Sequence, residues 1–120
     1  MSFLHTQLKQ EQTALLHLLP NQGPTSIAFA FTNIKILLLE ISQSQEDDSI
    51  YYQAWTSLNA ASMNEFDYML DYFGSGLISH YDSSFIRLKY LINNELDKVW
   101  VSLAPHYGDT PRPLSNRMDY

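Results

Sequence analysis

Residues 85–103, FIRLKYLINNELDKVWVSL, carry apolar side chains at the spacing of one helical face. The intervals are 3, 4, 4, 3 and 4 residues, at Phe85, Leu88, Ile92, Leu96, Val99 and Leu103. This period predicts an amphipathic α-helix whose apolar stripe packs against other elements. Asp82 or Ser83 is the expected N-cap, and Pro105 is expected to end the helix because proline cannot donate to the helical ladder.

The preceding segment predicts two shorter helices. Three carboxylates at residues 46–48 suit the positive end of a helix dipole, so one helix is expected from there to about Ala61. Ser62 and Glu65 match a capping box, which predicts that a second helix begins at Ser62. That helix is expected to end at Gly74-Ser75-Gly76, because glycine weakens a helix by about 1 kcal/mol relative to alanine.

Two more segments lie closer to the N-terminus. The leucine spacing of residues 2–19 predicts an amphipathic helix, and the prolines at 20 and 24 are expected to end it. Residues 25–42 are apolar almost all round, which is typical of a buried central helix. A β-hairpin over 26–41 is the alternative, but Thr32-Asn33 is a poor two-residue turn and the length favours a helix.

Together these segments predict one all-α domain for the chain of 120 residues. We expect a bundle of four to five helices over 1–104 and an extended, proline-containing tail over 105–120; the hairpin at 26–41 would instead give an α+β fold. Cysteine is absent, no signal-peptide pattern is recognisable, and the longest apolar stretch, Ile27–Ile41, is short for a bilayer span of about twenty residues. A cytoplasmic protein without membrane association is expected.

Motifs for catalysis and metal binding are weak in this sequence. Neither Glu-x-x-His nor His-Glu-x-x-His occurs, so we expect no enzyme activity, no cofactor and no metal site. Gly74-Ser75-Gly76 does not match the Gly-x-Ser-x-Gly pattern of a nucleophile elbow. Asn64, Asp67 and Asp71 share one side of a predicted helix and suit a hard cation, although a solvated acidic face is the favoured interpretation.

Charge is distributed unevenly along the chain. No Lys or Arg occurs between Lys35 and Arg87, and this stretch holds eight carboxylates in a chain with a formal charge of −6. A negative surface repels nucleic acid but attracts a basic protein, and Tyr and Trp are typical anchors of protein interfaces. The predicted partner-binding residues are Asp67, Asp71, Tyr68, Tyr72, Tyr51, Trp55, Asp47 and Asp48.

Three functional classes follow from these features. The favoured one is a small acidic module that inhibits or sequesters a basic partner such as a nuclease or toxin, in the manner of immunity proteins and antitoxins. The alternative is a self-associating structural or assembly component, such as a homodimer, that uses the apolar helix and the C-terminal tail. An enzyme without a recognisable motif is the third class.

Overall fold

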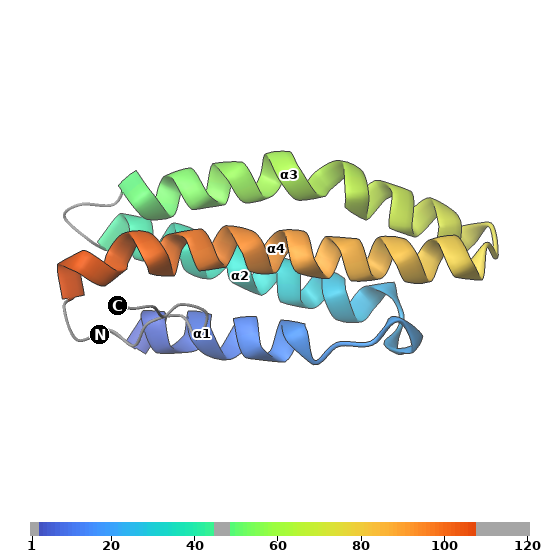
Figure 1. Cartoon of the computed structure of the whole chain (residues 1–120), viewed down its shortest axis with the longest axis horizontal. Helices are drawn as coiled ribbons and strands as arrows, with labels where there is room; N and C mark the ends of the chain where they lie inside the picture. Colours follow the sequence, from blue (N-terminus) through green and yellow to red (C-terminus); the bar gives the residue numbers. More distant parts are fainter. Residues whose placement is uncertain (1–2, 45–48, 108–120) are drawn as a thin grey trace.

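The computed structural model describes residues 3–44 and 49–107 and shows a bundle of four α-helices (Figure 1). They are α1 (Phe3–Leu16), α2 (Pro24–Ser44), α3 (Ser49–Gly74) and α4 (Ile78–Tyr107), with the short 3-10 helix η1 (Pro20–Gln22) between α1 and α2. Since no strand occurs in the described residues, the all-α prediction is confirmed and the hairpin at 26–41 is wrong.

Successive helices run in opposite directions, so the bundle has an up-down-up-down topology (Figure 1). The most extensive packing joins α3 to α4, and α2 packs against both α1 and α3. Along the long axis of Figure 1, the connection between α3 and α4 extends past η1 and the start of α2. The α3–α4 hairpin therefore has an end that α1 and α2 do not fully cover.

The core is made by the apolar faces that the sequence period predicts. On α4, the stripe residues Phe85, Leu88, Ile92, Leu96 and Val99 are buried. On α2, the completely buried side chains are those of Ile27, Ile34, Leu38 and Ile41. The interpretation of residues 25–42 as a central helix is thus confirmed, because this helix supplies core residues along its whole length.

The length and composition of α2 would also allow it to cross a membrane. The stretch Pro24–Gln43 covers 20 residues with a mean hydropathy of 1.4, and it is longer than the apolar stretch Ile27–Ile41 on which the expectation from the sequence was based. The core helix of a water-soluble bundle meets the same criterion, and 44% of the most apolar window of α2 is buried within this bundle.

The predicted boundary at Ser62 is wrong, because α3 is continuous from Ser49 to Gly74. Ser62 lies in the middle of α3, is completely buried, and its hydroxyl has no hydrogen-bond partner. Glu65 does not cap this helix; its Oε1 lies 3.7 Å from Nη1 of Arg87 on α4. A capping box is a local signature, and here packing of the apolar face over both halves of α3 overrides it.

Replacing Ser62 with Ala is expected to raise the free energy of unfolding, because it removes a buried polar group without a partner. The gain should exceed that of the exposed control Ser57→Ala, which reports helix propensity alone, by about 1 kcal/mol. Urea unfolding followed by circular dichroism measures both values. A loss of about 1 kcal/mol, the effect of removing an N-cap, would contradict this account of α3.

The reversal between α3 and α4 is a Schellman motif. The Leu77 amide donates to the carbonyl of Tyr72 at 3.0 Å, and the Gly76 amide donates to that of Phe73 at 3.2 Å. Gly76 has φ +75, a conformation that side chains other than glycine rarely adopt. Because this turn is complete at Leu77, α4 begins at Ile78, several residues before the predicted caps Asp82 and Ser83.

The outer ends of two predicted elements also differ from the structure. α1 ends at Leu16, earlier than the predicted residue 19, and η1 follows. α4 continues through Pro105 to Tyr107, so residues 105–107 are helical and the boundary expected at Pro105 is wrong. The remainder of the predicted tail, 108–120, lies outside the described residues.

Buried polar side chains attach α1 to the rest of the bundle. Nε2 of Gln12 donates to Asn93 and Asp97 of α4, at 2.8 Å and 2.9 Å, while its Oε1 accepts from Nε1 of Trp100 at 2.7 Å. His5 forms a hydrogen bond with the hydroxyl of Tyr51 on α3, and burial lowers the pKa of this histidine. These bonds link residues that are far apart in sequence and so define how α1 docks.

Candidate functional site

The candidate site is the uncovered end of the α3–α4 hairpin, which we define as residues 67–82 and call the hairpin end. It carries the carboxylates Asp67, Asp71 and Asp82 and contains no Lys or Arg. The neighbouring cation Arg87 lies beside Glu65 at 3.7 Å, so its charge is partly balanced. The hairpin end therefore presents a negative charge that no cation within the segment offsets.

Several predicted partner-binding residues are exposed at the hairpin end. Asp67 and Asp71 are exposed on α3, and 54% of Tyr68 is accessible to solvent. Tyr72 is partly buried, with its ring centroid 5.1 Å from that of His80 on α4. The structure thus brings four of the predicted residues together on the last turns of one helix.

Two other predicted residues, Tyr51 and Trp55, do not belong to this surface. Tyr51 is 2% exposed and belongs to the core, where it bonds to His5. Trp55 is partly buried and stacks on Tyr52 at 5.8 Å. From the sequence, Tyr51 and Trp55 were expected on a helix that ends at about Ala61, separate from the helix that carries Tyr68, but α3 is continuous. Its rise therefore separates Trp55 from Tyr68 by roughly 20 Å.

Asp47 and Asp48, the last of the predicted partner-binding residues, lie outside the described residues.

A polar hollow lies between α3 and α4 on one flank of the hairpin end. Its volume is about 340 Å³, and its lining residues are Glu65, Tyr68, Tyr72, Ser79, His80, Ser83, Ser84 and Arg87. The hollow combines two tyrosine rings with hydroxyl groups and an ion pair. This mixture of ring surface and hydrogen-bonding groups resembles the composition of protein-binding surfaces more than that of an enclosed ligand site.

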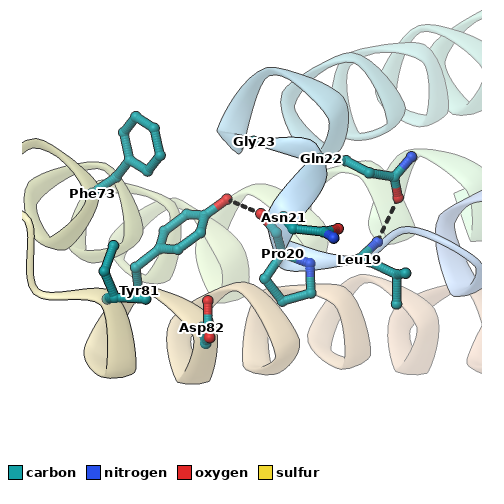
Figure 2. A pocket seen from close by; sticks show the side chains of 9 residues that line it. Leu19, Pro20, Asn21, Gln22, Gly23, Phe73, Tyr81 and Asp82 are labelled. Atoms are coloured by element: carbon teal, nitrogen blue, oxygen red, sulfur yellow. Dashed lines mark hydrogen bonds between the residues drawn. The ribbon is translucent and has the colours of Figure 1, made fainter.

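An apolar groove, which we call the η1 groove, shares no lining residue with the polar hollow. It lies between η1 and the hairpin end, has a volume of about 590 Å³, and is shown in Figure 2. Its lining residues are Leu19, Pro20, Asn21, Gln22, Gly23, Phe73, Ile78, Tyr81 and Asp82. Because adjacent helical residues point about 100° apart, Tyr72 and Phe73 line different hollows.

Tyr81 connects the two walls of the η1 groove. Its hydroxyl donates to the carbonyl of Pro20 at 2.7 Å (Figure 2), while its ring is almost completely buried. Burial raises the pKa of Tyr81, and the negative charge of Asp82 raises it further. The hydroxyl therefore keeps its proton at neutral pH and remains a donor to Pro20.

The η1 groove was not predicted from the sequence. Its walls come from segments about fifty residues apart, which no local period connects. One signal was present: two large apolar residues, Leu77 and Ile78, directly follow a glycine turn, and residues beside such a turn commonly lie at the surface. In the structure they are 47% and 60% exposed.

Metal ligands do not gather at the hairpin end. Among the side chains that the structure describes, no three from His, Asp or Glu are close enough to hold a metal ion. Comparison of the chain with family models, curated proteins and solved structures gave no match. We therefore infer the function from the geometry and chemistry of this surface.

Proposed function

We propose that this protein is a small acidic protein-binding module that inhibits or sequesters a basic partner. The observation that supports this most is the hairpin end, where Asp67, Asp71 and Tyr68 are exposed together and no Lys or Arg occurs from 67 to 82. The proposal covers the class of partner, a cationic protein such as a nuclease or toxin, and involves no catalytic step.

The physical basis is electrostatic attraction followed by burial of aromatic rings. Carboxylates of one sign increase the rate of encounter with a cationic protein, and this gain decreases as salt screens the charges. Tyr68 then offers a large ring with a polar hydroxyl, a common anchor at protein interfaces. In a nuclease, the Lys and Arg that hold phosphate would pair with these carboxylates, and this pairing would block the substrate.

Reversing the charges of Asp67 and Asp71 tests the proposal. The immobilised protein should retain a basic protein from an extract of its own organism at about 50 mM salt and lose it at about 500 mM. Asp67→Lys/Asp71→Lys should reduce retention at least tenfold, because attraction becomes repulsion. Mass spectrometry identifies the retained protein, and calorimetry with that purified protein measures the affinity.

The matched control is Glu11→Lys/Glu40→Lys, which makes the same change in net charge on α1 and α2. This control should retain the partner within about threefold, since its charges lie outside the hairpin end. Equal losses in both double variants would show that net charge alone determines retention. Unchanged retention in Asp67→Lys/Asp71→Lys would contradict the proposed surface.

Self-association is the second candidate, and exposed apolar residues on α2 favour it. Phe29 and Ile36 are 67% and 51% exposed and lie seven residues apart, on one face of the helix. Two such faces could pack in a symmetric dimer. Sedimentation at micromolar concentration tests this: a dimer that persists in high salt and disappears in Phe29→Ser/Ile36→Ser would support it over a monomeric inhibitor.

A further inference from the structure

The wall of the η1 groove formed by residues 19–23 is held by a set of short hydrogen bonds. The backbone N–H of Leu19 donates to the side-chain Oε1 of Gln22 at 2.6 Å, and the backbone N–H of Gln22 donates to the Leu19 carbonyl at 3.0 Å. The Gly23 amide donates to the Pro20 carbonyl at 3.1 Å, which also accepts the Tyr81 hydroxyl. Such a wall is largely ordered before a partner arrives, which reduces the entropy lost on binding.

The apolar side chains of the groove are open to solvent. Leu19, Phe73 and Ile78 are 55%, 47% and 60% exposed, and they line the groove from the segment before η1, from α3 and from α4. The groove volume of about 590 Å³ is sufficient for apolar side chains of a partner. Burial of this exposed surface would contribute roughly 25 cal/mol for each Å² removed from water.

Charge selects what can occupy this groove. Asp82 is the one charged residue in its lining, which includes no Lys or Arg. The nearby cation Lys89 is buried on α4, and its Nζ donates to the carbonyls of Leu16 and Leu18. Lys89 is therefore directed toward the end of α1, and Asp82 remains available to a cation brought by a partner.

We propose that the η1 groove binds a short helical segment of another protein, in which apolar side chains enter the groove and a neighbouring Lys or Arg pairs with Asp82. The inference rests on the proposed function, since such a segment belongs to a basic partner. It adds a second contact region, made by apolar burial, to the charged surface at Asp67 and Asp71. An amphipathic helix lying in an apolar groove is a common mode of peptide recognition.

A synthetic helical peptide tests the groove without knowledge of the natural partner. The probe is a labelled 14-residue peptide with Leu at helical positions i, i+3, i+4 and i+7 and Lys elsewhere, and fluorescence polarisation measures its binding. The wild-type protein should bind it, and the same peptide with Glu in place of Lys should bind at least tenfold more weakly. Equal affinity for both peptides would overturn the proposal.

Variants in the groove locate the binding. Ile78→Ser should weaken the Lys peptide about tenfold, and Asp82→Asn should weaken it about threefold and reduce the salt dependence. Ile86→Ser is the matched control, because Ile86 is similarly exposed at 45% and also lies on α4, but outside the groove. Circular dichroism confirms that each variant is folded. If Ile86→Ser weakens binding as much as Ile78→Ser does, the peptide does not occupy the groove and the proposal fails.

The two proposals fail in different ways. Asp67→Lys/Asp71→Lys should change binding of the Lys peptide less than threefold, because neither residue lines the groove. Absence of peptide binding together with partner capture that depends on Asp67 and Asp71 would overturn the groove alone. Peptide binding that depends on Ile78, without any salt-sensitive basic partner in the extract, would overturn the proposed function alone.

Discussion

Replacing Gln12 with Leu is expected to lower the free energy of unfolding by about 3 kcal/mol, although the two side chains have similar volumes. Every polar atom of the Gln12 amide contacts α4: Nε2 donates to Asn93 and Asp97, and Oε1 accepts from Trp100. Leucine would leave the buried Trp100 N–H without its acceptor. It would also remove a hydrogen-bond donor to Asp97. Each lost bond at this part-buried site lowers the free energy of unfolding, because water cannot fully replace the missing partner.

Urea unfolding of Gln12→Leu, with Gln10→Leu as the control, measures this effect. Gln10 is exposed on the same helix, so its replacement should change stability by less than about 0.5 kcal/mol. In Trp100→Phe the donor to Gln12 is absent. The double variant Gln12→Leu/Trp100→Phe should therefore lose less unfolding free energy than the sum of the losses in the two single variants. Additive losses would mean that Gln12 and Trp100 do not act through their shared bond.

The sequence predicted the helices well where one apolar period runs without interruption. The stripe from Phe85 to Val99 is buried as expected, because a period of 3.6 residues leaves few other ways to cover so much apolar surface. The errors came from local signals that tertiary packing overrides. Ser62 looks like an N-cap in sequence, but the core-facing residues on both sides of it favour one long helix.

The candidate site was predictable only in part, for a similar reason. The exposure of Asp67, Asp71 and Tyr68 follows from their positions relative to the buried face of α3. Tyr51 was assigned to the same surface because tyrosine is common both at interfaces and in cores. In the structure it is buried in the core and bonds to His5, forty-six residues away in sequence. The η1 groove likewise forms only when η1 and the hairpin end come together in the fold.

Replacing Lys89 with Met is expected to lower the free energy of unfolding by about 3 kcal/mol. Lys89 is 7% exposed, and its Nζ donates to the carbonyls of Leu16 and Leu18 at 3.3 Å and 2.9 Å. These carbonyls belong to the end of α1 and the chain that follows it, where helical partners are missing. Methionine keeps most of the aliphatic stem but leaves both carbonyls without this donor. Lys98→Met is the control, since Lys98 is exposed and pairs with Glu95 at the surface, where an ion pair should contribute less than about 0.5 kcal/mol.

Lys89→Met also separates two ways in which this residue can affect the η1 groove. Leu18 directly precedes the groove wall at residues 19–23, so loss of its anchor should loosen that wall and weaken binding of the Lys peptide several-fold. If Lys89 acted only through its charge, removing a cation near Asp82 would instead strengthen binding of a cationic peptide. The two effects have opposite signs, so fluorescence polarisation with the folded variant decides between them. Tighter binding of the Lys peptide to Lys89→Met would show that the groove wall does not depend on the bonds made by Lys89. Weaker binding would show that the docking of α1 helps to maintain the shape of the groove.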